Sequence, residues 1–136
     1  IWGIQWDETL KWLIDTGEKT YAEIGSDSTS WGNYKNNSFT YYTNTSKSTA
    51  TKSSGTRTRI PSGAYEGANA NNVFDLAGNV YDWTLESGGS GASFYRYVRG
   101  GSFNYYGYSF YEAYRGNYNP SYSYDYNGLR CALYIK

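Results

Sequence analysis

The side chains that could do chemistry in this chain are of few kinds, and tyrosine dominates them. Cys131 is the only cysteine, and the 136 residues include 18 tyrosines and no histidine. This inventory excludes zinc sites, which need several cysteine or histidine ligands, and histidine-based proton transfer. A single cysteine also cannot form an internal disulfide. We therefore expect neither a zinc site nor histidine-based catalysis, and the tyrosines become the candidates for a binding function.

Half of the tyrosines lie in one window, residues 104–127. The window holds nine Tyr, four Asn, three Ser and one Asp among its 24 residues, whereas the segments on either side have ordinary compositions. Tyrosine offers a large amphipathic contact area with only two torsions to order, and Ser, Gly and Asn adapt their hydrogen bonds to a partner. Antibody paratopes have this composition. We therefore predict that residues 104–127 form a ligand-binding segment.

The ligand-facing roles are assigned to most of the Tyr, Asn, Ser and Asp side chains of this window. They are Asn104, Tyr105, Tyr106, Tyr108, Tyr111, Asn117, Tyr118, Asn119, Ser121, Tyr122, Ser123, Tyr124, Asp125 and Tyr126. If residues 121–126 form a strand, alternation places the tyrosines on one face and Ser121, Ser123 and Asp125 on the other. Arg115 and Pro120 are interpreted as fixed spacers, and Tyr114 as a possible core residue. A low-complexity loop is the competing interpretation of the window.

Periodicity predicts the helices that come before the binding segment. One helix is expected over residues 6–16, with Gly17 just after its end. The apolar residues that share its inner face are Trp6, Leu10, Leu13 and Ile14. Thr20 and Glu23 have the spacing of a capping box, which predicts a second, short helix ending near Gly25.

Short strands and loops are predicted for the rest of the chain. Short strands or turns are expected within residues 73–76 and 80–85, and strands within residues 95–99 and 129–135, where apolar residues lie between turn residues. Residues 43–59 contain no large apolar side chain and are predicted to be a long exposed loop. Early helices followed by short strands predict an α+β fold, and the length fits a single domain over residues 1–136.

Three sequence blocks resemble those of a known enzyme family. Residues 73–86 read VFDLAGNVYDWTLE, residues 97–103 read YVRGGSF, and residues 128–132 read GLRCA. In this order they are similar to the blocks of the formylglycine-generating enzyme (sulfatase-modifying factor) family. The resemblance implies a loop-rich C-type lectin-like fold of the formylglycine-generating-enzyme subtype.

The residues of these blocks also suit a scaffold. The pair Gly78-Asn79 tolerates positive φ, and the pair Gly100-Gly101 permits close approach of another backbone segment. Trp83 is expected to anchor the core. Arg99 and Arg130 are expected to bond loop carbonyls or carboxylates inside the domain.

The catalytic cysteines of that family are missing here. Its members bind copper through two cysteines that follow the RGGS block with four residues between them. The matching positions are Tyr105 and Phe110, and neither can act as a thiolate ligand. Cys131 matches a different family position, and its apolar neighbours predict a buried structural thiol. The resemblance therefore implies that the protein is not an enzyme, and we expect no catalytic residue and no cofactor.

The resemblance also raises the question of calcium. Some family members hold structural calcium near the block that contains Asn79 and Asp82, and carboxylate and amide oxygens suit that ion. Backbone capping explains the same two residues, so the prediction stays with no metal. The Glu-Pro-Asn, Gln-Pro-Asp and Trp-Asn-Asp motifs of calcium-dependent lectins do not occur in the sequence.

The composition of residues 104–127 has a genetic explanation. Asparagine codons of the form AAY become Tyr, Asp or Ser codons when one adenine changes. The chain resembles the variable proteins of diversity-generating retroelements, which combine a C-type lectin fold, an RGGS block, a diversified stretch and a fixed final strand. The resemblance implies recognition of a protein or glycan target on a cell surface, by a protein of a virion (phage tail) or of a bacterial cell surface. Two alternatives remain open: a catalytically inactive formylglycine-generating-enzyme-like scaffold, and a carbohydrate-binding module.

Charge and hydropathy narrow the choice of partners further. Twelve basic and twelve acidic residues give a net charge of zero, so we expect no nucleic-acid partner. The longest apolar run is far shorter than a bilayer-spanning helix, so this domain is not expected to insert into a membrane. Because Ile1 stands almost at the start of the first predicted helix, the chain is interpreted as the C-terminal part of a longer protein. The sequence determines neither the identity of the ligand nor the oligomeric state.

Overall fold

A computed structural model describes residues 1–90 and 94–131. Two helices, α1 (Gly3–Asp15) and α2 (Tyr21–Gly25), come first and are followed by a 3-10 turn, η1 (Thr29–Trp31). A second 3-10 turn, η2 (Glu66–Ala68), precedes the third strand. The strands are β1 (Phe39–Tyr42), β2 (Thr49–Lys52), β3 (Asn69–Ala70), β4 (Val73–Phe74), β5 (Tyr81–Gly88), β6 (Tyr95–Arg99), β7 (Gly116–Tyr118) and β8 (Asn127–Leu129). The predicted α+β class is confirmed.

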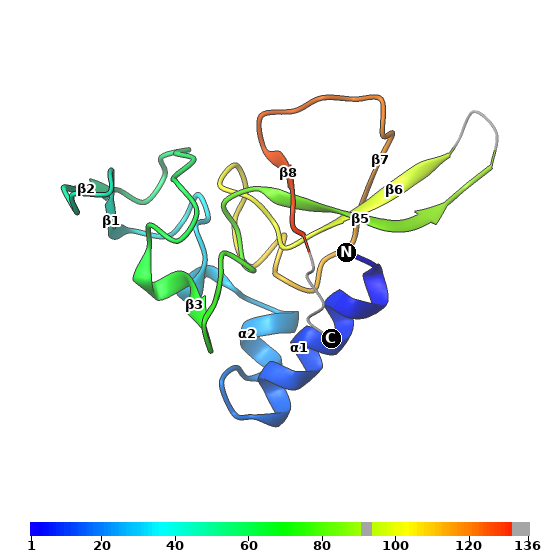
Figure 1. The fold of residues 1–136 in the computed structure, drawn as a ribbon, viewed down its shortest axis with the longest axis horizontal. Coiled ribbons are helices and arrows are strands. Elements are labelled where there is room, and N and C mark those ends of the chain that lie inside the picture. Colours follow the sequence, from blue (N-terminus) through cyan, green and yellow to red (C-terminus); the bar gives the residue numbers. More distant parts are fainter. Residues whose placement is uncertain (91–93, 132–136) are drawn as a thin grey trace.

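The largest sheet has four strands in the order β7-β6-β5-β8. Strand β6 pairs antiparallel with both β5 and β7, whereas β5 and β8 run parallel. Figure 1 shows β5 and β6 as a long ribbon, with α1 and α2 on one side of it and the small β1–β2 hairpin at the far end of the molecule. Because β7 and β8 are the two edges of this sheet, residues 119–126 must cross from one edge to the other.

Helix α1 supplies the main apolar face. Trp6, Leu10 and Leu13 are buried and belong to the central core, whereas Ile14 is half-buried at its border. The helix begins three residues before the predicted start at residue 6 and ends at Asp15. Gly17 follows with a φ of 76°, a left-handed conformation that favours glycine at this position. The predicted helix and its end signal are therefore confirmed.

Helix α2 is held by the predicted capping box. The Thr20 hydroxyl accepts a hydrogen bond from the Glu23 amide at 3.2 Å, and the Glu23 carboxylate accepts one from the Thr20 amide at 2.8 Å. The helix ends at Gly25, as predicted, and its Ile24 packs into the same core as α1.

The prediction of one exposed loop over residues 43–59 is wrong in part. Residues 49–52 form β2, which pairs antiparallel with β1 from Phe39↔Lys52 to Tyr42↔Thr49. The Lys52 ammonium is buried and donates to the backbone oxygens of Tyr34 at 2.7 Å and Asn37 at 2.8 Å. Burial lowers the pKa of Lys52 to about 8. A lysine that ends a strand by capping carbonyl groups has no signature in hydrophobic periodicity, which explains the error.

The final predicted strand, residues 129–135, is also corrected. Strand β8 covers Asn127–Leu129, and Arg130 and Cys131 follow it without strand structure. Residues 132–135 of the predicted strand lie outside the described residues. Cys131 is exposed, not buried as expected; its side chain lies beyond the last strand pair and not in the core.

Candidate ligand-binding surface

The backbone of the tyrosine-rich segment is tied to the sheet and to the core at several points. The Phe103 amide donates to the backbone oxygen of Asn79 at 2.9 Å just before the segment begins. Within the segment, the backbone oxygen of Glu112 accepts a hydrogen bond from the Gly100 amide at 3.2 Å. Strand β7 lies within the segment, and the Tyr81 amide donates to the Tyr126 oxygen at 2.8 Å near its end. These contacts hold residues 104–127 as two loops on a fixed support, one before β7 and one between β7 and β8.

The support itself is built from the two predicted arginines. The Arg99 guanidinium is buried, donates to the Ala113 oxygen at 2.5 Å and forms an ion pair with Asp7 of α1. Arg130 donates to the Phe74 oxygen at 2.8 Å and to the Asp75 oxygen at 2.9 Å. It also pairs with Asp82 at 3.2 Å. The expected role of both arginines is confirmed.

Positive φ angles occur where the sequence blocks suggested them. Gly78 and Asn79 have φ angles of 72° and 61°, and Gly100 and Gly101 have φ angles of 88° and 74°. A Cβ on Gly101 would lie 2.3 Å from the Phe110 oxygen, so this position requires glycine to let the tyrosine-rich segment approach.

The side chains of Asn79 and Asp82 are already used by the protein. The Asn79 amide oxygen accepts from the Asn33 side chain and from the Ile60 amide, each at 3.1 Å, and its amide nitrogen donates to the Ile60 oxygen at 3.1 Å. Asp82 is paired with Arg130; burial raises its pKa to about 6. These contacts favour the capping interpretation over the calcium alternative. Among the residues that the structure describes, no group of three metal-binding side chains is found.

All 14 side chains predicted to face a ligand are at least partly exposed, and they form two sets that we call together the tyrosine surface. The exposed set is Tyr106, Tyr108, Asn117, Ser121, Tyr122, Ser123, Tyr124 and Asp125. The half-buried set is Asn104, Tyr105, Tyr111, Tyr118, Asn119 and Tyr126.

Residues 121–126 do not form the strand that alternation would require. The side-chain oxygen of Asn119 accepts hydrogen bonds from the Ser121 amide at 3.0 Å and from the Ser121 hydroxyl at 2.7 Å. The backbone oxygen of Asn119 accepts a third hydrogen bond from the Tyr122 amide at 3.0 Å. Asparagine side chains favour such turns, and Pro120 cannot donate to a strand. Tyr122 and its serine neighbours are therefore exposed together, not on opposite faces.

Five aromatic rings pack against one another beneath this turn, and we call them the tyrosine cluster. They are Tyr81, Tyr105, Tyr118, Tyr124 and Tyr126. The buried Tyr81 ring lies 6.1 Å from the rings of Tyr105 and Tyr118 and 6.3 Å from that of Tyr126, and Tyr124 stacks on Tyr126 at 4.9 Å. Burial raises the pKa of Tyr81 and of Tyr118 above the usual value, which keeps both hydroxyls neutral. The cluster is a small aromatic core that supports the outer residues.

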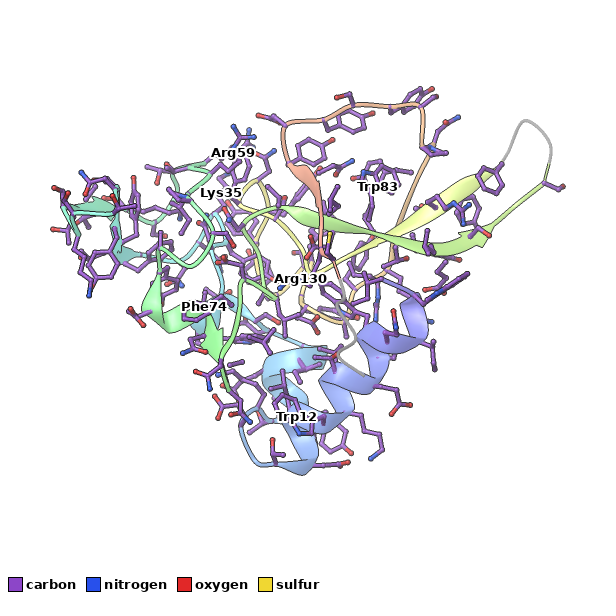
Figure 2. All side chains as sticks on the ribbon, in the orientation of Figure 1. Trp12, Lys35, Arg59, Phe74, Trp83 and Arg130 are labelled. Atoms are coloured by element: carbon purple, nitrogen blue, oxygen red, sulfur yellow. The ribbon has the colours of Figure 1, made fainter. Side chains whose placement is uncertain are left out.

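Trp83 belongs to the edge of this cluster and not to the main core, which corrects its predicted role. Its ring meets Tyr118 edge-on at 6.4 Å, and the side chain is half-buried. Figure 2 shows Trp83 beneath the arc of residues 119–126. Tyr114 is half-buried too, where its ring meets Phe110 at 4.8 Å.

A second group of rings lies in the loop before β7. Tyr106 and Tyr108 stack with ring centroids 5.3 Å apart and remain 39% and 55% exposed. The Lys35 ammonium lies 4.9 Å above the Tyr106 ring, within the range of a cation–π interaction. Lys35 comes from a distant segment of the sequence, so the composition of residues 104–127 did not reveal it.

Arg59 is the other residue that composition missed. Its guanidinium donates to the Asp125 oxygen at 3.2 Å and so contacts the loop between β7 and β8. Figure 2 shows Lys35 and Arg59 on the side of this loop that faces the β1–β2 hairpin. The signal that would have found them is charge: residues 32–65 contain five basic residues and no acidic one.

A buried carboxyl group belongs to the tyrosine-rich segment itself. Glu112 is fully buried; it accepts a hydrogen bond from the Trp6 indole, and its second oxygen has no partner among the described residues. Burial raises the pKa of Glu112 to about 8, against the opposing effect of Arg99. The group is therefore largely protonated in the folded protein at neutral pH, but ionised in the unfolded chain.

This difference predicts that stability falls as the pH rises from about 4.5 to about 8, because the folded state holds the proton more tightly in that window. Each unit of pKa difference corresponds to about 1.4 kcal/mol. The free energy of unfolding of Glu112→Gln, relative to that of the natural chain, should therefore increase by several kcal/mol as the pH rises from 5 to 8. Urea unfolding of both chains at the two pH values measures this gain. Glu66→Gln, at an exposed position, is the control. A stability difference that does not change with pH would contradict the prediction.

None of the helices within residues 1–90 and 94–131 is long and apolar enough to cross a bilayer.

Three comparisons with known proteins bear on the identity of the chain. No curated protein and no solved structure matches the chain. The profile of one family does match, over residues 10–135, and this range includes both loops of the tyrosine surface and the strands that hold them. The chain therefore belongs to the family of the sulfatase-modifying factor enzyme 1-like domain.

Proposed function

We propose that this protein binds a macromolecular target through the tyrosine surface. The observation that supports this most strongly is the contrast between the anchored backbone of the segment and its exposed side chains. The backbone of residues 104–127 is bonded to the sheet and the core, yet eight of the 14 predicted side chains are exposed, four of them tyrosines. Rigid aromatic anchors next to adaptable Asn and Ser groups are typical of paratopes, and exposed rings of this kind are costly without a partner.

We further propose that the domain has the C-type lectin-like fold of the formylglycine-generating-enzyme subtype and is a variable protein of a diversity-generating retroelement. Of the exposed residues within 104–127, all except Arg115 and Pro120 are Tyr, Asn, Ser or Asp. All four amino acids are reached from AAY codons by single adenine changes or by none. The target is then a protein or glycan on a cell surface, and the protein belongs to a phage tail or a bacterial cell surface.

Binding is proposed instead of catalysis, with no cofactor. The family positions of the two copper-binding cysteines hold Tyr105 and Phe110, whose rings pack against each other with centroids 4.3 Å apart. The fold thus brings these two positions together, but neither side chain offers a thiolate for copper. An inactive scaffold of the same family would share this feature, so the display of exposed tyrosines is what favours a binding protein.

The experiment that tests this proposal is to sequence the DNA around the gene. We expect a near-copy of the codons for residues 104–127, with AAY codons where the protein has Tyr, Ser or Asp, and a neighbouring reverse transcriptase gene. A repeat whose differences from the gene are confined to adenines would support diversification. A gene neighbourhood with neither repeat nor reverse transcriptase would leave the inactive scaffold as the better explanation.

A further inference from the structure

The charges of this protein are distributed unevenly, although their sum is zero. Residues 1–31 carry six acidic side chains and two basic ones, whereas residues 32–65 carry five basic side chains and no acidic one. The basic residues of the second segment are Lys35, Lys47, Lys52, Arg57 and Arg59. Two of them, Lys35 and Arg59, contact the tyrosine surface.

The backbone holds these two cations beside the two loops of that surface. The Lys35 amide donates to the Tyr105 backbone oxygen at 2.8 Å, which places the Lys35 backbone beside this loop, and its ammonium lies 4.9 Å from the Tyr106 ring. Arg59 is held to the other loop through the Asp125 oxygen. The Asn33 side chain donates to the Thr58 oxygen at 2.9 Å and so joins the two basic stretches. Arg57 is exposed and lies two residues before Arg59 in the sequence. We call Lys35, Arg57 and Arg59 the basic rim.

The charges of the basic rim are not neutralised within the protein. Among residues 1–90 and 94–131, the ion pairs are formed by Lys11, Arg99, Arg115 and Arg130. Near the tyrosine surface, Asp125 is exposed, Glu112 is fully buried, Asp7 is paired with Arg99 and Arg115, and Asp27 accepts a hydrogen bond from the Thr29 amide. The surface therefore combines neutral tyrosines with a net positive edge.

We propose that the tyrosine surface recognises an acidic segment of a protein, with carboxylates of that segment placed on the basic rim and its apolar groups on the tyrosine rings. This inference rests on the proposed binding function. Opposite charges at the edge of an interface steer the encounter and select the partner, and Tyr and Arg are the residues that contribute most to binding hot spots. Three separated cations suit a few carboxylates, whereas a nucleic acid needs a longer basic track along its phosphates.

The test uses peptides selected from a displayed library of random sequences against the natural chain. We expect the selected peptides to be enriched in Asp and Glu. Their affinity should fall about tenfold or more for the double variant Lys35→Gln/Arg59→Gln. The matched control is Lys11→Gln/Lys19→Gln, which removes the same charge from α1 and from the connection between α1 and α2. It also removes the same kind of cation–π contact, since Lys19 lies 5.0 Å from the Trp31 ring. This control should bind like the natural chain.

The outcomes separate this inference from the proposed function. In one outcome the selected peptides are neutral, bind the Lys35→Gln/Arg59→Gln variant normally and fail to bind a variant without exposed tyrosines. This outcome would contradict an acidic partner and support the tyrosine surface as the binding site. Acidic peptides that bind the tyrosine-deficient variant as well as the natural chain would overturn the proposed surface. Binding of single-stranded DNA or a sulfated glycan, in competition with the selected peptide and at equal affinity, would show a general anion site and contradict a protein partner.

Discussion

Replacing Tyr106, Tyr108 and Tyr122 together by serine is expected to abolish binding and to leave the fold intact. These rings are 39%, 55% and 57% exposed and are not members of the tyrosine cluster. Substitutions at exposed positions usually change the free energy of unfolding by no more than about 0.5 kcal/mol each. Loss of an aromatic anchor at an interface can cost about 2 kcal/mol or more of binding free energy. Binding is measured with a peptide selected on the natural chain, and stability by thermal melting.

The tyrosine cluster provides the matched comparison. Tyr105, Tyr118 and Tyr126 are half-buried around Tyr81, so the same three changes to serine at these positions should remove packing and lower the free energy of unfolding by several kcal/mol. A large fall in melting temperature for the exposed triple variant would mean that those rings are core, and the paratope proposal would fail. A binding loss only for the cluster variant would place the site on the cluster instead.

Leu13→Asp is the substitution expected to damage the fold most. Leu13 is fully buried in the core that α1 forms with Ile24 of α2, Trp31 and Leu76. An aspartate there removes an aliphatic group whose loss typically costs about 2–5 kcal/mol, and it also buries a charge without a partner. Small domains have only about 5–15 kcal/mol of stability, so the variant should be largely unfolded at room temperature. Circular dichroism and urea unfolding measure this.

Ile4→Asp is the control on the same helix. Ile4 is 65% exposed and lies in the first turn of α1, where a negative charge is favourable. This variant should unfold with the same cooperativity and nearly the same midpoint as the natural chain. If Leu13→Asp and Ile4→Asp behaved alike, the packing of α1 in the core would be refuted.

The local structure near the N-terminus was predictable because its causes are local. A repeat of apolar residues every three or four positions is sufficient to define the inner face of α1, and the Thr20–Glu23 capping box acts within one turn. The order of the three sequence blocks was also sufficient to indicate the family, and the roles of Arg99 and Arg130 followed from it. The composition of residues 104–127 identified the candidate surface before its geometry was known.

The division of that surface into support and display was decided only by the tertiary structure. All its tyrosines are alike in the sequence, but those that pack around Tyr81 are half-buried because β5, β7 and the start of β8 bring their rings together. Tyr122 is exposed because the turn at Asn119 lifts it away from this cluster, whereas alternation along a strand would have grouped it with Tyr126.

The same distinction explains the residues that the sequence-based prediction misplaced. Lys52, Trp83 and Cys131 have burial that depends on neighbours far away in the chain, which neither periodicity nor a family block describes. Lys35 and Arg59 join the tyrosine surface through contacts over 66 or more residues of sequence. Composition and spacing determine which side chains are available and which local elements they form. Long-range strand pairing and hydrogen bonding decide which of them meet, because those contacts depend on the folded backbone.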